Sequence, residues 1–185
     1  MAGLYFLVSS LPALREGQAP PFSSEDLISR CCSWLSEKEM GILRKMSLVP
    51  DMLGEKPTPA TLAEWKSWET SMRNRIAKTR KPTFQTDPAS HLGNETNYYS
   101  AIERGVQDAF ASADPLSREK LLDGMRWKKL EDLEAGHMFD FDTICIYMLK
   151  LMIMEKSSPR TVQKGTESFD EIMNNTFNNK ITMTL

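Results

Sequence analysis

The sequence contains few of the side chains on which most enzymatic and metal-binding chemistry depends. Its 185 residues include two histidines and three cysteines. Neither His91 nor His137 lies at metal-ligand spacing from another histidine or cysteine, and the adjacent pair Cys31–Cys32 is too tight for a zinc knuckle. A phosphate-binding glycine-rich loop and a nucleophile elbow are also missing. Carboxylates are plentiful, but most fall where a solvated helix face would carry them, as do Glu119, Asp123, Glu131, Asp132 and Glu134. We therefore expect no metal, no cofactor and no catalytic residue, and predict that the protein is not an enzyme.

The chain also lacks an excess of one charge and a long hydrophobic run. With 23 basic and 25 acidic residues its formal net charge is -2, so no bulk basic character draws it to nucleic acid or to an anionic membrane. The apolar run from Ile144 to Met154 would span roughly 16 Å as a helix, well short of the hydrocarbon core of a bilayer. It is interrupted only by Lys150, and such a helix is typical of the buried centre of a helical domain.

Two smaller features favour a cytosolic protein. The apolar run Leu4–Val8 is short and has no basic residue before it, so we expect this segment to pack on the protein instead of acting as a signal peptide. An odd number of cysteines, with Cys145 inside the apolar run, is typical of reduced thiols.

Helix-start signals recur along the sequence. A Ser or Thr followed three residues later by Asp or Glu predicts a capping box, and an Asp or Ser before Pro predicts a capped first turn. Either Asp140 or Asp142 caps the central helix, and Pro82 and Gly136 end the helices before them. The other predicted starts are Ser23 with Asp26, Ser36 with Glu39, Thr61 with Glu64, Asp114–Pro115 and Ser158–Pro159.

These signals predict an all-α protein of about seven helices around the apolar central helix. We expect helices over about 23–34, 36–46, 61–80, 96–113, 115–135, 142–156 and from 158 onward, with loops over 49–59 and 82–93. Residues 4–14 favour a strand or a short helix equally. The chain is interpreted as a single domain over residues 1–185, with an alternative of two pseudo-repeated halves, 1–81 and 94–178, joined by the 82–93 loop.

One helix and its neighbours supply the candidate contact residues. Positive charge loads the C-terminal half of the predicted 61–80 helix, from Arg73 to Lys81. It is either a solvated helix end matched to the helix dipole or a docking surface for an acidic partner, where Asn74 would add directional hydrogen bonds. Trp68 and the pair Arg126–Trp127 place tryptophan beside charge, a pattern found both in half-buried core and at interfaces.

Three tracts of the sequence resemble a bacterial family of uncharacterised proteins encoded within operons for V-type (A/V-type) ATP synthases in Bacteroidetes, spirochaetes and chlamydiae. The tracts are Tyr5 to Pro12, Trp68–Glu69 with Met72-Arg73-Asn74, and Arg126–Trp127 through Gly136 to Asp140. That family is similar, more distantly, to the C-type subunit (d-type in eukaryotes) of the V-type rotary ATPase. This C/d-type protein, here called the socket subunit, is all-helical and sits between the rotor stalk and the membrane ring. The residues that match its recurring pattern are Glu119, Asp123, Asp140 or Asp142, and Lys150. The socket subunit is considerably longer and is built from repeated helical units.

The resemblance implies a non-catalytic subunit or assembly factor of a bacterial V-type ATP synthase. It would act by contact with subunits of the central stalk and the membrane ring, in the cytoplasm and peripheral to the inner membrane through the complex. The predicted partner-binding residues are Arg73, Asn74, Trp68, Arg126 and Trp127. The alternative is a helical module that binds nucleic acid or a phosphate ligand through the Arg73–Lys81 cluster, although the charge balance leads us to expect no nucleic acid.

Overall fold

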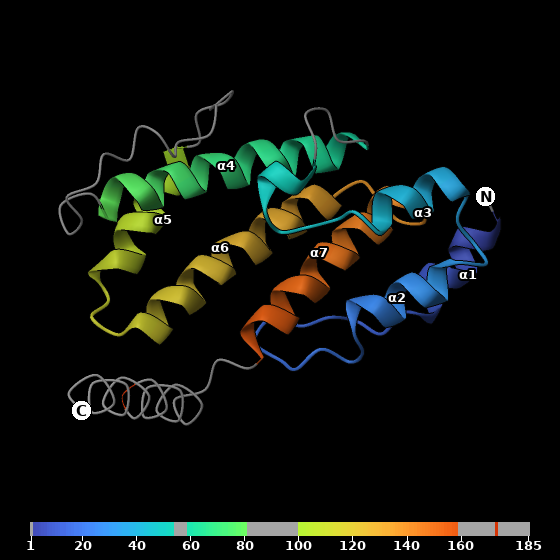
Figure 1. Ribbon diagram of the computed structural model, residues 1–185, viewed down its shortest axis with the longest axis horizontal. Coiled ribbons are helices and arrows are strands. Elements are labelled where there is room, and N and C mark those ends of the chain that lie inside the picture. Colours follow the sequence, from blue (N-terminus) through green and yellow to red (C-terminus); the bar gives the residue numbers. More distant parts are fainter. Residues whose placement is uncertain (1, 54–58, 81–99, 159–172, 174–185) are drawn as a thin grey trace, which may run out of the picture.

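The computed structural model describes residues 2–53, 59–80, 100–158 and 173 (Figure 1). Over these ranges the chain forms helices and no strand, so the predicted all-α fold is confirmed. The elements in order are α1 (Ala2–Ser10), α2 (Ser24–Cys31), α3 (Glu37–Leu43), the short 3-10 helix η1 (Pro50–Leu53), α4 (Ala60–Arg80), α5 (Ser100–Ala111), α6 (Pro115–Glu134) and α7 (Phe141–Ser157). The predicted 82–93 loop, the start of the predicted 96–113 helix and almost all of the helix predicted after Ser158 lie outside the described residues.

Several helix ends follow from the local chemistry that the sequence contains. Ser23 caps α2: its Oγ accepts from the Asp26 amide (3.1 Å), and the Asp26 carboxylate accepts from the Ser23 amide (3.0 Å). Ser36 and Glu39 form the same box at α3. Asp114 precedes Pro115 and caps α6. The cap of α7 is Asp140, which accepts from the Thr143 amide (2.9 Å), so the choice between Asp140 and Asp142 is decided.

The structure decides one open question from the sequence and corrects one predicted helix cap. Residues 2–10 are helical, which settles the ambiguity of the first segment for most of its length. The capping box predicted at Thr61 is wrong, because α4 starts one residue earlier and the Leu62 amide already bonds to the Pro59 carbonyl (3.1 Å). The Thr61 hydroxyl instead donates to Asp142 Oδ1 of α7 (2.6 Å), and Glu64 pairs with Lys129. The Thr61 hydroxyl, which the local pattern assigned to a helix cap, is thus used in a contact between α4 and α7.

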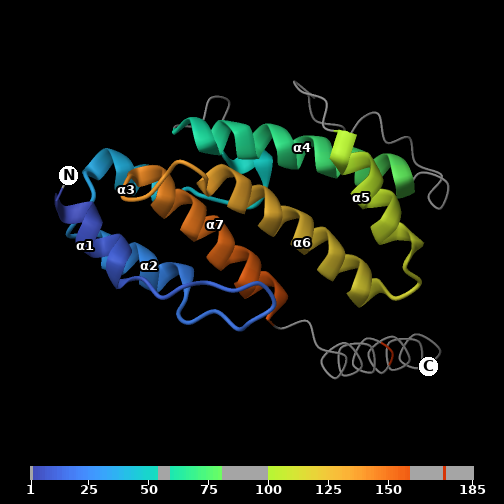
Figure 2. The ribbon, with the colours of Figure 1, turned by 180° about the vertical axis from the view of Figure 1, so that it is seen from behind.

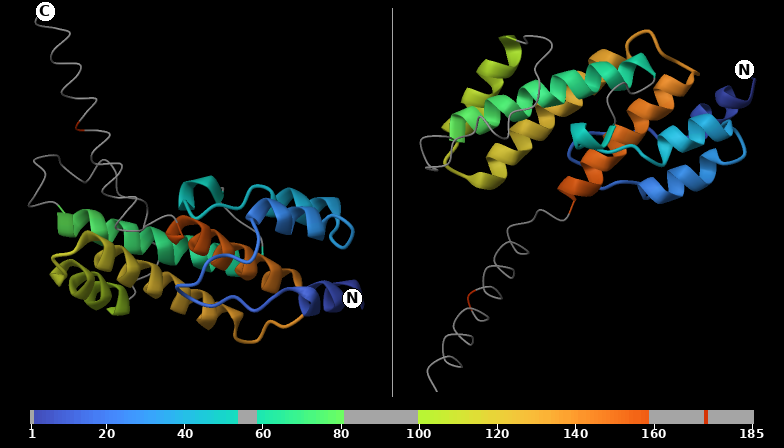
Figure 3. Two further views of the ribbon diagram at one scale, coloured as in Figure 1. Left: turned by 90° about the horizontal axis from the view of Figure 1, so that it is seen from below. Right: turned by 45° about the horizontal axis from the view of Figure 1, so that its top comes forward.

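Helix α7 is the centre of the molecule. It runs beside α6, with α4 crossing above this pair and α5 at the far end of α4 and α6 (Figures 1 and 2). Helices α1, α2 and α3 pack on the other side of α7, and the two further views separate these layers (Figure 3). The prediction of a buried central helix is confirmed, because from Thr143 to Met154 every residue except Tyr147 and Met152 is buried.

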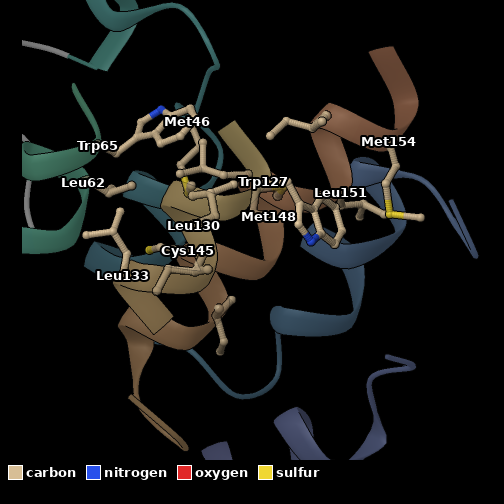
Figure 4. Packing of buried hydrophobic residues seen from close by; sticks show 14 of the residues in the cluster. Met46, Leu62, Trp65, Trp127, Leu130, Leu133, Cys145, Met148, Leu151 and Met154 are labelled. Carbon is tan, nitrogen blue, oxygen red and sulfur yellow. The ribbon is translucent and has the colours of Figure 1, made fainter. Parts of the chain in front are cut away.

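The buried side chains form one hydrophobic cluster that extends from Leu7 in α1 to Met154 in α7. Its middle lies where α4, α6 and α7 meet (Figure 4). There Trp65 is completely buried and stacks on Trp68, with 5.7 Å between the ring centroids. Beside Trp65 the close-up labels Met46, Leu62, Trp127, Leu130, Leu133, Cys145, Met148, Leu151 and Met154. Among the helices that the structure describes, none combines the length and apolar character needed to cross a membrane.

Candidate functional site

A buried network of charged side chains ties α4 to α6 and α7. Arg126 donates from Nε and Nη2 to the two carboxylate oxygens of Glu69 (3.0 Å each) and from Nη1 to Asp123 Oδ1 (2.8 Å). Lys156 of α7 reaches the same Asp123 oxygen (3.1 Å), and Arg73 reaches Glu69 Oε1 (2.8 Å). A guanidinium held between two carboxylates in this way satisfies charges that would be very costly to bury alone.

Burial and pairing act in opposite directions on Arg126. Desolvation lowers the pKa of its guanidinium, but the charges and hydrogen bonds of Glu69 and Asp123 outweigh it and raise the pKa above its usual value. Glu69 is fully buried and Arg126 is 6 % exposed. The centre of the network, formed by Glu69, Asp123 and Arg126, is therefore a buried ion cluster, and Arg73 and Lys156 extend it to the surface.

Four of the five predicted contact residues belong to this interior. Trp68, Asn74, Arg126 and Trp127 are all buried. The Trp127 indole donates to Glu131 Oε1 (2.9 Å), and Lys150 lies over its ring at 5.5 Å. Arg73 is the member with an exposed side chain, although its guanidinium bonds to Glu69 and to the Leu48 carbonyl (3.3 Å). The sequence shows that tryptophan and charged residues are adjacent in the chain. It does not show which of these side chains face the neighbouring helices and become buried.

The basic half of α4 lies beside α5. Arg75 pairs with Glu103, and the Arg80 guanidinium lies 5.7 Å from the centroid of the Phe110 ring. Both interactions hold positive side chains against the neighbouring helix. Arg75 and Arg80 therefore already have partners within the molecule, which leaves less positive charge for the nucleic-acid binding that the alternative proposes.

The turn between α6 and α7 brings three potential metal ligands together. His137 Nδ1 lies 2.6 Å from Asp140 Oδ2, and one ligand atom from each of His137, Asp140 and Asp142 falls within 4.8 Å of the others. These groups already have partners, since Asp140 caps α7 and Asp142 accepts the Thr61 hydroxyl. The absence of a metal site stays a prediction.

Protonation at this turn follows from the same contacts. The hydrogen bond to Asp140 raises the pKa of His137 above its ordinary 6.5, which burial opposes and the Asp140 and Asp142 charges favour. Burial raises the pKa of Asp140, but hydrogen bonds from His137 and Thr143 outweigh it and lower that pKa. The pair is therefore an ion pair in mildly acidic solution.

An open pocket of about 600 Å³ lies between the loop after α1 and the helices α6 and α7. Its wall includes Asp123 and Trp127 from α6 and Ile153 from α7. Glu16 approaches α6 closely here, because a Cβ at Gly124 would lie 2.9 Å from Glu16 Oε1. The pocket thus borders the ion cluster at Asp123, and its wall also contains the charged residues Glu16 and Lys120.

Large apolar side chains gather on the surface where α1 meets the turn between α6 and α7. Tyr5, Phe6, Met138 and Phe139, here called the aromatic surface, are exposed by 50, 62, 69 and 40 %. The Tyr5 ring contacts Phe6 (centroids 5.6 Å apart) and Phe139 (4.7 Å). Sequence reasoning did not single out these residues as contacts. The sequence signal that could have identified them is two pairs of adjacent apolar residues, Tyr5–Phe6 and Met138–Phe139. Two neighbouring side chains on a helix or turn cannot both face the same core, so one of each pair is expected at the surface.

Comparisons with known proteins identify a family. A family model described as "Protein of unknown function (DUF2764)" matches residues 62–180, more than half of the chain. No curated protein and no solved structure matches the chain. The matched range covers the ion cluster and the turn with Met138 and Phe139, whereas Tyr5 and Phe6 precede it.

Proposed function

We propose that this chain, which belongs to the DUF2764 family, is a non-catalytic subunit or assembly factor of a bacterial V-type ATP synthase that acts by contact with other proteins. The supporting observation is the aromatic surface. Tyr5 contacts Phe6 and Phe139, Met138 precedes Phe139 in the chain, and all four leave large apolar side chains in water. Contiguous patches of this kind mark interaction sites in folded proteins, and aromatic anchors carry much of the energy of interfaces.

The identity of the partner complex rests on the sequence resemblance. The three tracts similar to proteins of V-type ATP synthase operons, and the distant likeness to the socket subunit, favour a place between the rotor stalk and the membrane ring. There the chain would be cytoplasmic and peripheral to the inner membrane through the complex. The all-helical fold of the described residues is compatible with such a role.

Co-purification from the native cells tests the proposal. The tagged chain is purified with mild detergent, and its companions are quantified by mass spectrometry against an untagged strain. Recovery of stalk or membrane-ring subunits in a stable ratio supports the role. If cells shown to contain the assembled ATPase yield none of its subunits, the proposal is wrong.

A second candidate, binding of nucleic acid or a phosphate ligand, depends on the exposed side chains of Arg73, Lys78 and Arg80. Such binding would weaken steeply with salt, because neutralised phosphates release counterions. A titration with mixed oligonucleotides at low salt that shows no binding removes it. The Glu69 and Phe110 partners of Arg73 and Arg80 make this the weaker candidate.

A further inference from the structure

Acidic residues flank Met138 and Phe139 of the aromatic surface along the chain. No Lys or Arg occurs in residues 1–14 or between Lys129 and Lys150. The second stretch forms the end of α6, the turn and the start of α7, and it contains Glu131, Asp132, Glu134, Asp140 and Asp142. Glu131 and Asp132 are exposed, and the side chains of Glu134 and Asp140 remain 42 and 45 % accessible beside their partners. Lys150 pairs with Glu134 and His137 pairs with Asp140, but the five carboxylates outnumber these two partners. The segment on either side of Met138 and Phe139 therefore carries an excess of negative charge, here called the acidic rim.

The basic residues Arg75 and Arg80 lie at the other end of α4. The start of α4 is tied to the acidic turn through Thr61 and Asp142, whereas its last residues pack on α5 through Arg75 and Arg80. A helix of 21 residues is about 30 Å long. Since this exceeds the screening length of about 8 Å at physiological salt, the two ends act independently on a partner.

The aromatic surface is held on rigid elements. Leu7, on the same helix as Tyr5 and Phe6, is 2 % exposed and belongs to the core. The Tyr147 hydroxyl of α7 donates to the Pro12 carbonyl (2.9 Å), which fixes the chain after α1. Preorganised side chains lose little freedom on binding, so their contact area converts to affinity efficiently.

We infer that the aromatic surface and its acidic rim bind an amphipathic helix whose apolar stripe is flanked by lysines or arginines. Resting on the proposed function, the inference assigns that helix to a subunit of the V-type ATP synthase. The carboxylates of the acidic rim would pair with the lysines or arginines of the partner helix, and the exposed apolar side chains would contact its apolar stripe. In the described residues the surface is built from α1, α6, α7 and a turn, so it presents no strand edge for an extended peptide, and recognition is by side chains.

Site-specific photo-crosslinking in the native cells tests the inference. A benzophenone amino acid replaces Phe6 in one strain and Leu121, an exposed apolar residue of α6 (49 %), in a matched strain. Adducts are mapped to peptides by mass spectrometry. We expect Phe6 to label a basic amphipathic helix of an ATPase subunit in larger yield than Leu121 does.

The other outcomes separate the inference from the proposed function. ATPase subunits labelled from Leu121 and not from Phe6, or labelled from Phe6 on a segment without basic flanks, overturn the inference and leave the function standing. If Phe6 instead labels a basic amphipathic helix of a protein outside the ATPase, the binding role of the aromatic surface stands and the proposed function is wrong. An absence of adducts at both positions contradicts both.

Charge reversal of the rim provides a second measurement on the purified complex. Asp132→Lys changes an exposed side chain at the rim, and Asp108→Lys makes the same change on α5. We expect Asp132→Lys to slow association by roughly tenfold and to reduce its dependence on salt, because rim charges act mainly on the association rate. Equal rates for the two variants overturn the acidic-rim assignment.

Discussion

At the scale of single residues, the loss of Arg126 should be strongly destabilising. Replacement by Met leaves the fully buried Glu69 to pair with Arg73, whose own side chain is 44 % exposed. Removing one partner of a buried pair costs about 3–5 kcal/mol of unfolding free energy, whereas Arg73→Met should cost no more than about 1 kcal/mol. Urea denaturation of both variants checks the order.

A double variant separates the net value of the pair from the penalty of an orphaned charge. Apolar replacements of a buried ion pair are often neutral, so Glu69→Met with Arg126→Met should be more stable than Arg126→Met alone. If Arg126→Met proves no more destabilising than Arg73→Met, the cluster is not the buried network that the distances describe. That result would return Arg126 to the set of contact candidates.

His137 should make stability depend on pH. Its folded-state pKa is raised above 6.5 by the bond to Asp140, so its contribution is fully present below 6.5 and is lost as the pH rises through the folded-state value. The difference in unfolding free energy between the wild type and His137→Ala should therefore be larger at about pH 5.5 than at about pH 8.5. Because His91 is present in both proteins, its own titration cancels from this difference. An equal difference at the two pH values would show that the pair forms no ion pair.

At the scale of the helices, Gly136 ends α6 in a conformation that other residues rarely adopt. Its φ is +97°, and a Cβ there would meet no atom within 4 Å, so Gly136→Ala introduces backbone strain and no clash. The expected loss is about 1–2 kcal/mol. Gly41→Ala is the matched control: Gly41 lies inside α3 with open space for a Cβ, so the change should stabilise the protein by about 0.5–1 kcal/mol. Thermal melts of the two variants should shift in opposite directions.

The helix ends also show which features can be predicted from neighbouring residues in the sequence. Ser23, Ser36, Asp114 and Gly136 act within one turn of the chain, where sequence neighbours are also spatial neighbours, so their roles could be predicted. Thr61 looked equally local, but its hydroxyl bonds to Asp142, 81 residues away.

The candidate site could not be predicted for the same reason. Arg126 is buried because Glu69, 57 residues away, meets it across two helices. The aromatic surface depends on a contact between Tyr5 and Phe139, which no periodicity in either segment specifies. Burial and surface patches are properties of the packed helices, so patterns within one helix do not determine them.

At the scale of the whole molecule, the core and the ion cluster run across the boundary between the two halves considered from the sequence. Helix α4 belongs to the first half, yet it packs on α5 and α6 of the second and shares with α6 the Glu69–Arg126 pair. If one half opened alone, Glu69 would be separated from the guanidinium that satisfies it. We therefore expect α4 and α6 to unfold together.

Native-state hydrogen exchange followed by mass spectrometry measures this directly on the full chain. Amides in the middle of α4 and of α6 should exchange with the same free energy and the same denaturant dependence, since both open only in the shared unfolding event. Arg126→Met should lower both free energies by the same amount. A lower opening free energy for α4 than for α6, with α6 unaffected by that variant, would show that the chain consists of two separable halves.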